Sequence, residues 1–574
     1  MNMTKVSEKI KFWLTGNFDE ETKSLIKELL ENNEQELIES FYKDLEFGTG
    51  GLRGKMGVGT NRMNKYTVGL ATQGLANYLK KYFKKIKEIK VVIAYDTRNN
   101  SKFFAETAAA ILSNNNIKVY LFDDFRPTPE LSFAIRNLKA HAGIVITASH
   151  NPKEYNGYKV YWEDGGQIVS PHDKNILEEI NNLDINNLDF TPKRSKIHII
   201  GEDIDTIYLA QLLKVSLNPQ IIQENAELSI LYTPLHGTGI KLIPKALNLY
   251  GFKNVQIVKE QAIPDGNFPT VKSPNPENPE ALQMALEKAK ELDSDIILAT
   301  DPDTDRLAVA VKHKNKYILL NGNQIGSIMT YYILRNLKEK NRLAGDEYIV
   351  KTIVTTDLIK LIAQAYNINV YEVLTGFKYI ARVIKEKEHT ESFIGGFEES
   401  FGYLVADFVR DKDGVMAALF ISEIAAWAKK EGKTLVDILN DIYIQYAFFK
   451  EKLINIVKEG INGTEEIAQI MNKYREETPA YINDTNIVLV RDYLTGIQSN
   501  LFNGEQKKIE LPSSNVIQFI LEDETIITVR PSGTEPKIKY YISVREKVKN
   551  YNELESVSKK LDKKIEGYLR ALGI

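Results

Sequence analysis

Short apolar segments, each followed by a turn and a stretch of helical periodicity, recur along the chain. Three of them, Lys90–Asp96, Leu228–Pro234 and Tyr348–Thr356, are largely apolar or β-branched. Strands that alternate with helices predict parallel sheets, so each segment is typical of the start of an α/β unit. Three such units in one chain indicate a repeated α/β domain.

The C-terminal part has a different pattern. Val516–Leu521, Thr525–Val529 and Lys537–Val544 predict three strands, and a helix is expected from about Tyr551. A polar connector is expected before them, around Lys458–Asp484. Runs of strands followed by a helix favour an α+β layout, so the expected fold is α/β with a smaller C-terminal α+β domain.

Four further segments complete the predicted organisation. Asp19–Leu45 has apolar residues at helical spacing amid many charges and predicts a pair of surface helices, and Asp413–Leu439 predicts amphipathic helices. Ser195–Asp205 is a plausible joint between domains. Pro264–Pro279 is rich in Pro and Asn and predicts a long surface loop.

Composition restricts the class of protein. A chain of 574 residues with 43% hydrophobic residues is too long for one core, so several domains are expected. The net charge of −3 gives no general attraction for nucleic acid or an anionic membrane, so the expected partner is a small molecule. There is no cysteine, and Met1–Trp13 carries four charged residues where a signal peptide needs an apolar core. We expect a cytoplasmic protein; its oligomeric state is not predicted.

Ser149 is the first candidate for chemistry. Ile144–Ile146 predicts the end of an inner strand, and Asn151-Pro152 and Asn156-Gly157 make the chain turn immediately afterwards. Ser149 is therefore expected at the carboxyl end of a strand, the side where open α/β sheets bind ligands.

A second candidate follows the predicted buried strand Ile296–Thr300. Asp301, Asp303 and Asp305 alternate along the chain, and in an extended segment such carboxylates point to one side and suit a hard cation. A calcium EF-hand does not fit, because Arg306 and Lys312 stand where that loop needs glycine and glutamate. Magnesium is expected, and a solvated acidic turn is the alternative.

Glycine-containing segments supply further candidates, each with a plain turn as the alternative. The glycines of Phe47–Lys55 suit close approach to an anion, with Arg53 adding charge. Two later loops, Leu374–Lys378 and Ile394–Tyr403, offer Lys378 for phosphate or hydroxyl contact and Glu398 and Ser400 for sugar hydroxyls.

The turn Arg530–Lys537 gathers the donors that a phosphate dianion requires. Arg530 and Ser532 contribute guanidinium and hydroxyl groups, while Gly533 and Thr534 contribute backbone and hydroxyl donors. These motifs together indicate phosphoryl transfer. No Walker A or G-x-G-x-x-G loop occurs in the right context, so a phosphorylated Ser149 is a more plausible donor than ATP.

The chain resembles the α-D-phosphohexomutase family over nearly its full length, and within it the phosphoglucomutase branch related to phosphopentomutases. Four motifs stand in the family's order: Thr147–Pro152, Asp301–Arg306, Gly396–Gly402 and Arg530–Pro536. The resemblance implies three related α/β domains with mixed or parallel sheets and a smaller fourth domain around a central cleft. The boundaries we expect are 1–205, 206–325, 326–448 and 449–574.

The resemblance also implies roles for individual residues. Ser149 would be the phosphoserine and, with Asp301, Asp303 and Asp305, a ligand of Mg²⁺. His150, Lys159, Arg53 and Arg306 would surround it, with Lys159 at the position suspected of general acid/base work. The remaining residues that the motifs single out would bind substrate: Thr375, Gly376, Lys378, Glu398, Ser400, Arg530, Ser532, Gly533 and Thr534.

The activity implied by the resemblance is interconversion of glucose 1-phosphate and glucose 6-phosphate. It would proceed through phosphoserine and glucose 1,6-bisphosphate, which would also be the activator. Phosphomannomutase, phosphopentomutase and bisphosphate synthase activities remain open alternatives, as do a serine phosphatase and a catalytically inactive regulatory protein that binds sugar phosphates.

Overall fold

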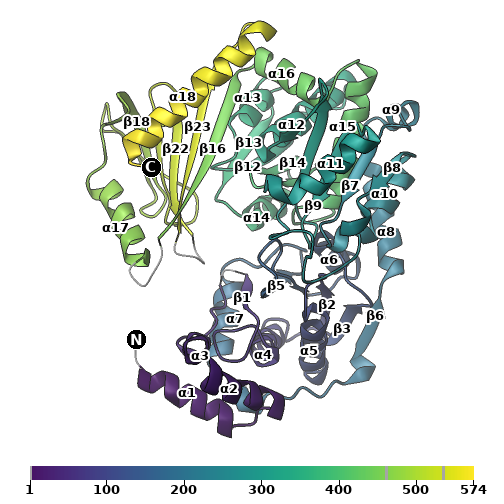
Figure 1. Ribbon diagram of the computed structural model, residues 1–574, viewed down its shortest axis with the longest axis vertical. Coiled ribbons are helices and arrows are strands. Elements are labelled where there is room, and N and C mark those ends of the chain that lie inside the picture. The colour runs from purple at the N-terminus through teal and green to yellow at the C-terminus, as the bar shows by residue number, and fades with distance from the viewer. Residues whose placement is uncertain (1–2, 49, 459–462, 533–536) are drawn as a thin grey trace. The chain divides into compact units, whose positions relative to one another are not determined.

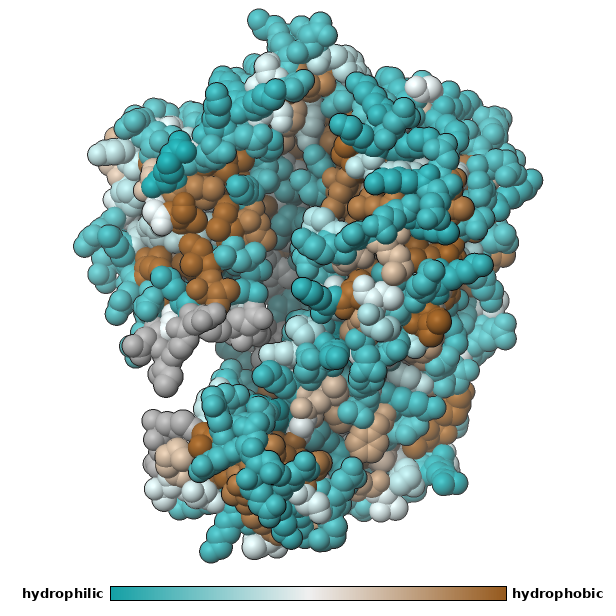
Figure 2. Space-filling view, viewed as in Figure 1, coloured by the Kyte–Doolittle hydropathy of each residue, from teal (hydrophilic) through white to brown (hydrophobic). Residues whose placement is uncertain are grey.

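The structure of the chain is a computed structural model that describes residues 3–48, 50–458, 463–532 and 537–574 (Figure 1). The chain divides into two compact units. The first comprises residues 1–322, 381–396 and 400–432, and the second comprises residues 323–380, 397–399 and 433–574. Hydrophilic residues cover most of the surface in view in Figure 2. No helix among the described residues is long and apolar enough to cross a bilayer.

The first sheet has six strands in the order β1-β5-β4-β2-β3-β6. β4, β2, β3 and β6 run parallel, whereas β5 and β1 are antiparallel to their neighbours. Apolar side chains of both sheet and helices form its core. Its strands are β1 (Gly51–Lys55), β2 (Lys90–Tyr95), β3 (Lys118–Phe122), β4 (Ala142–Ile146), β5 (Tyr155–Trp162) and β6 (Ile197–Ile200). Its helices are α4 (Lys65–Tyr82), α5 (Ser101–Asn114), α6 (Thr128–Asn137) and α7 (His172–Asn181).

Three helices precede this sheet in the chain. They pack around an aromatic cluster in which the rings of Trp13 and Phe18 stack with centroids 4.4 Å apart. The predicted pair of helices after Asp19 is confirmed, although Leu25 and Leu30 lie on the exposed side. The helices are α1 (Met3–Thr15), α2 (Glu20–Asn32) and α3 (Glu34–Phe41).

The second sheet has five strands in the order β11-β10-β9-β7-β8. β9, β7 and β8 are parallel, and β10 and β11 are antiparallel additions. The strands are β7 (Ile230–Thr233), β8 (Val255–Ile257), β9 (Ile296–Thr300), β10 (Leu307–His313) and β11 (Lys316–Leu320). The helices are α8 (Glu202–Leu212), α9 (Pro219–Glu224), α10 (Ile243–Tyr250), α11 (Gln283–Leu292) and α15 (Gly414–Lys430).

The third sheet has the order β13-β12-β14-β15, with β12 and β13 parallel. Its strands are β12 (Glu347–Thr352), β13 (Asn369–Val373), β14 (Ser392–Glu398) and β15 (Gly402–Leu404). The nearby helices in the chain are α12 (Gly322–Glu339), α13 (Leu358–Gln364), α14 (Phe377–Lys387) and α16 (Leu435–Gln445).

The C-terminal sheet is built differently, from antiparallel strands in the order β16-β23-β22-β21-β18-β19-β20, with β17 beside β18. Helix α18 lies across the sheet and contacts β16 and β23 (Figure 1). The strands are β16 (Phe448–Val457), β17 (Tyr481–Ile482), β18 (Thr485–Asp492), β19 (Ile497–Asn500), β20 (Gln506–Lys508), β21 (Ile517–Leu521), β22 (Ile526–Pro531) and β23 (Lys537–Glu546). The helices are α17 (Gly463–Glu476) and α18 (Leu554–Leu572).

The expected class, three α/β domains with mixed sheets and a smaller C-terminal α+β domain, is therefore confirmed. The three segments that predicted α/β units form β2, β7 and β12, and each has a parallel neighbour. Pro264–Pro279 is confirmed as a loop, but Phe268 within it is buried.

Three local predictions were wrong. The connector expected at Lys458–Asp484 contains α17, whose Ile467, Ile470, Met471 and Tyr474 form a helical apolar stripe against the C-terminal core. The loop expected at Ile394–Tyr403 begins inside β14. Finally, α15 is buried on nearly every side from Gly414 to Ala428, so it is not amphipathic.

Candidate active site

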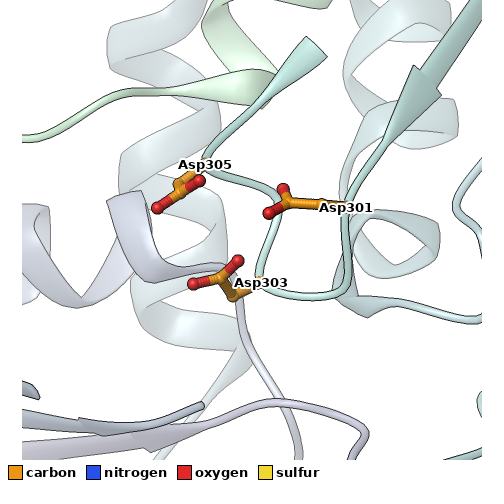
Figure 3. A group of neighbouring side chains, drawn as sticks. All are labelled: Asp301, Asp303 and Asp305. Atoms are coloured by element: carbon orange, nitrogen blue, oxygen red, sulfur yellow. The ribbon is translucent and has the colours of Figure 1, made fainter. Parts of the chain in front are cut away.

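Three aspartates gather at the carboxyl end of β9. Asp301, Asp303 and Asp305 are buried, and one carboxylate oxygen from each lies within 4.8 Å of the others. Figure 3 shows the three carboxylates directed toward a common space. The structure thus brings the predicted acidic cluster together.

The carboxylates converge because the chain turns, which corrects the expectation of an extended segment. Thr304 has φ +57°, and its backbone N–H donates to the Asp301 carbonyl at 3.0 Å. The N–H of Thr238 donates to Pro302, and the N–H of Gly414 donates to Thr304. A Cβ on Gly414 would lie 2.6 Å from the Thr304 carbonyl oxygen, so this contact requires glycine.

Ser149 lies in the turn after β4 and reaches this cluster. Its Oγ donates to Asp301 Oδ2 at 2.6 Å and lies 3.0 Å from His150 Nδ1. The residue has φ +52° and is only 3% exposed, while its N–H donates to Thr147 Oγ1 at 2.8 Å. A left-handed serine carries backbone strain, which persists only where its surroundings hold it.

Basic groups surround the carboxylates. Lys159, on β5, places Nζ 2.8 Å from Asp303 and 3.6 Å from Asp305. The Arg306 guanidinium pairs with Glu277 and places Nε 3.8 Å from Asp305 Oδ1, and the backbone N–H of Arg306 donates to Asp301 Oδ1 at 3.1 Å. These cations offset part of the charge that three buried carboxylates concentrate.

The pKa values follow from this arrangement. Burial lowers the pKa of Lys159, but Asp303 and Asp305 outweigh it and raise that pKa, so the lysine is a cation. Burial, together with Arg306 and Arg53, holds the pKa of His150 well below its usual range, so its imidazole is neutral at pH 7.

The donor set fits a hard cation. Asp303 Oδ1 and Asp305 Oδ1 are buried and have no hydrogen-bond partner among the described residues. Buried carboxylate oxygens without a partner are costly unless a cation meets them. The cluster could therefore hold a metal ion with oxygen ligands.

Arg53 lies on β1, and the N–H groups of Gly50 and Gly51 just before it donate to the Gly48 carbonyl, which is the tight turn that was the alternative to an anion loop. Gly51 pairs with Lys159, and a Cβ at Gly51 would lie 1.8 Å from the Tyr158 carbonyl oxygen. Glycine is therefore required there for close strand pairing. The Arg53 side chain lies near the Ser149 turn, with Nη1 3.5 Å from Asn151 Oδ1.

The residues expected to bind sugar lie in two parts of the chain. Gly376 has φ +118° and donates its N–H to Glu398 Oε1 at 2.8 Å, which joins the Thr375-Gly376 turn to the end of β14. Lys378 stands in the first turn of α14, with Nζ over the ring of Tyr379. Ser400 follows in the turn after β14.

The structure describes only the base of the loop that is expected to bind phosphate. Arg530 lies on β22 opposite Lys539 of β23, and the N–H of Ser532 donates to the Lys537 carbonyl at 2.7 Å. Gly533 and Thr534 lie outside the described residues.

The sequence interpretation missed several groups at the site. Lys412 places Nζ 3.2 Å from Asp305, and Thr128 donates its N–H to the Asp303 carbonyl. Arg98 binds the backbone of the Ser149 turn. The signal for Arg98 was its place just after β2, because β2 is parallel to β4 and their carboxyl ends meet at one edge. Lys412 stands just before Asp413–Leu439, where the sequence predicted only helices.

Family models match three consecutive parts of the chain. They are described as phosphoglucomutase/phosphomannomutase α/β/α domains I, II and III, and they match residues 44–187, 207–315 and 321–446.

Similar proteins have been named in bacteria. A phosphoglucomutase of Staphylococcus epidermidis is 40% identical over 91% of this chain and 94% of its own length. A phosphoglucomutase of Staphylococcus aureus is 38% identical, with the same coverage.

Two solved structures share the fold. Parafusin, a phosphoglucomutase from Paramecium, aligns with a TM-score of 0.66 and 18% identity over 92% of this chain and 96% of its own. A phosphoglucomutase/phosphomannomutase family protein from Burkholderia thailandensis aligns with a TM-score of 0.64 and 17% identity, covering 92% and 97%.

Proposed function

Because the chain belongs to the phosphoglucomutase/phosphomannomutase family, we propose that it is an isomerase that interconverts glucose 1-phosphate and glucose 6-phosphate. The observation that carries the proposal is the contact of Ser149 Oγ with Asp301, 2.6 Å away in a buried carboxylate cluster. The names of relatives at 40% and 38% identity support the choice of glucose over other sugars.

Ser149 acts as the phosphate carrier in this proposal. The bond between phosphorus and Ser149 Oγ breaks as a bond forms to one hydroxyl oxygen of the sugar monophosphate, which gives glucose 1,6-bisphosphate. Lys159, which is a cation, can give a proton to the serine oxygen, and its neutral amine then takes the proton of the sugar hydroxyl, so that no proton is gained or lost. Transfer of the other phosphate back to Ser149 reverses these steps and restores the starting state. Glucose 1,6-bisphosphate would also load an unphosphorylated Ser149 and thus act as activator.

Asp301, Asp303 and Asp305 would hold Mg²⁺ together with an oxygen at Ser149. When bound, Mg²⁺ supplies positive charge that offsets the charge on the phosphoryl group. The cations Lys159 and Arg306 stand beside the same carboxylates, and His150 and Arg53 stand beside the serine turn. These residues would orient the phosphoryl group and stabilise its charge.

The remaining predicted residues are assigned to substrate recognition. Glu398 and Ser400 would bind two sugar hydroxyls, next to Thr375, Gly376 and Lys378. The phosphate that does not react would bind the fourth-domain loop, made of Arg530, Ser532, Gly533 and Thr534. In this assignment the four domains, 1–205, 206–325, 326–448 and 449–574, contribute one loop each.

The test begins with intact mass of the purified chain, to measure phosphate on Ser149. The protein is then given glucose 1-phosphate, Mg²⁺ and a trace of glucose 1,6-bisphosphate. We expect glucose 6-phosphate from the wild type and none from Ser149→Ala, in which the phosphate is also absent from the mass. Release of inorganic phosphate in place of glucose 6-phosphate would instead identify a phosphatase.

A substrate panel tests the sugar. Glucose, mannose, glucosamine and ribose phosphates are compared by kcat/KM under the same activator concentration. We expect glucose 1-phosphate to have the highest value. A higher value for mannose or ribose phosphate would overturn the assignment of glucose while leaving the mutase reaction in place.

A further inference from the structure

Arg98 lies at the centre of the turn that carries Ser149. It follows β2 in the sequence Asp96-Thr97-Arg98, and its side chain is 0% exposed. One terminal nitrogen donates to the carbonyls of Ser149, at 2.6 Å, and Asn151. The other donates to the carbonyls of Pro152, at 2.9 Å, and Tyr155, at 3.0 Å.

The rest of the guanidinium faces Asp96 and Phe268. Nε makes no hydrogen bond among the described residues but lies 3.5 Å from Asp96 Oδ2, and the Phe268 ring lies over the guanidinium at 5.0 Å. Asp96 Oδ1 is fixed in turn by the N–H of Arg98 and the hydroxyl of Ser101, at 2.9 and 2.6 Å. A guanidinium has five N–H donors in a rigid plane, and here the four terminal ones bind carbonyl oxygens while the fifth faces a carboxylate.

Arg98 holds the Ser149 turn in its conformation through these contacts. Four carbonyl oxygens converge on one cation, so the turn closes around it and their partial negative charge is compensated next to the aspartate cluster. Ser149 keeps φ +52° while its own carbonyl is held by Arg98. The same turn places Ser149 Oγ on Asp301.

We propose that Arg98 is a positioning residue, which fixes the Ser149 turn so that the serine oxygen stays at the carboxylate cluster for phosphoryl transfer. The inference rests on the proposed mutase function. Arg98 acts through the backbone of the turn, because its four terminal N–H donors are taken up by carbonyl oxygens there. Its loss should therefore lower kcat and leave KM for glucose 1-phosphate nearly unchanged.

The test variant is Arg98→Lys, which keeps the charge but has three donors that cannot span four carbonyls. A displacement of about 1 Å can cost about 100-fold in rate, so we expect kcat to fall about 100-fold. The matched control is Arg62→Lys. Arg62 is also buried and donates to one carboxylate, Glu36, and to two backbone carbonyls, but in the N-terminal part of the chain. Its variant should keep kcat within about 3-fold of wild type.

A crystal structure of each variant supplies a readout that does not depend on activity. We expect the φ angle of Ser149 to leave the left-handed region in Arg98→Lys and to keep it in Arg62→Lys. If Arg98→Lys does not fold, Asp96→Asn replaces it, because that change keeps the side-chain shape and weakens the ion pair alone; a smaller fall in kcat at constant KM is then expected.

The outcomes separate the two proposals. A wild-type chain that does not interconvert the glucose phosphates would overturn the proposed function, and the φ angle of Ser149 would still test the role of Arg98. An active wild type with equal losses of kcat in Arg98→Lys and Arg62→Lys would overturn the positioning role. A rise in KM with unchanged kcat would also overturn it, because Arg98 would then act in substrate binding.

Discussion

Two lysines with little exposed surface, Lys159 at 13% and Lys351 at 1%, each face two carboxylates. We call the Lys351 cluster complete, because its carboxylates have no buried oxygen that lacks a hydrogen-bond partner among the described residues, and the Lys159 cluster incomplete. In the first unit, Lys159 lies 2.8 Å from Asp303 and 3.6 Å from Asp305. In the second, Lys351 lies 2.9 Å from both Asp357 and Glu372. The distances are alike, so ion-pair geometry alone does not separate a functional cluster from a structural one.

The carboxylate oxygens separate them. Asp303 and Asp305 are almost fully buried, and each has an oxygen without a hydrogen-bond partner among the described residues. Asp357 and Glu372 are 29% and 26% exposed, and neither has a buried oxygen that lacks a partner in the part of the chain that the structure describes. Lys351 also donates to the carbonyls of Thr352 and Thr355, so it stabilises the local backbone. Buried carboxylate oxygens without a partner therefore distinguish the cluster that could hold a cation from the ion pairs of Lys351.

The largest effect on stability is expected at the complete cluster. Lys351→Met leaves Asp357 and Glu372 without their cation and should lower the free energy of unfolding by about 3 kcal/mol. This loss is at the low end for a broken buried ion pair, because both carboxylates are partly exposed to water. Urea unfolding measures it. Lys360→Met is the control, since the exposed Lys360 is 3.8 Å from the same Glu372 and should cost below about 1 kcal/mol. Equal losses would mean that Lys351 has no special role.

Metal removal should affect only the incomplete cluster. Mg²⁺ at about 100 times its Kd should stabilise the wild type by about 2.7 kcal/mol, because it binds the folded chain alone. Thermal unfolding with Mg²⁺ and with EDTA measures this, with Asp303→Asn as the variant that should lose the shift. Glu372→Gln should keep it. A melting temperature that ignores Mg²⁺ in the wild type would contradict a metal site at Asp301, Asp303 and Asp305.

The sequence predicted the acidic cluster, but it did not predict the residues that contact the cluster from other parts of the chain. Asp301, Asp303 and Asp305 are close in the chain, so their meeting required only a local turn. Lys412 and Thr128 come from distant segments, and only the folded chain brings them to Asp305 and Asp303. A contact of that kind has no signature in local spacing.

The fold shows the same division. Apolar runs predicted β2, β7 and β12 because inner parallel strands are buried on both faces. Helix α17 carries many charged residues besides its apolar stripe, so the sequence predicted a polar connector there. Gly51 suggested an anion loop. In the structure, glycine is needed there because β1 and β5 lie too close together for a Cβ.

Acid should weaken the complete cluster through Glu372. Lys351, acting against burial, lowers the pKa of Glu372 to about 2 from its usual 4.5. Because the folded-state pKa is depressed, the stabilisation is present above pH 4.5 and is lost as the pH falls toward 2. Allowing for its partial exposure, we expect about 2 kcal/mol. Urea unfolding between pH 7 and pH 3 should show this slope in the wild type and a flatter profile in Glu372→Gln. Equal slopes would assign the acid sensitivity to other groups.

Opposite signs for two similar substitutions give the finest test of the comparison. Glu372→Gln removes a carboxylate that its lysine needs, so it should destabilise the chain at pH 7. Asp301→Asn removes one of three carboxylates within 4.8 Å of one another, so without metal it should stabilise the chain by about 1 kcal/mol after the weakened bonds to Ser149 and Arg306 are counted. Unfolding in EDTA measures both. If Asp301→Asn instead lowers stability in EDTA, the buried charge at Asp301 is already balanced within the protein, and the distinction between the clusters fails.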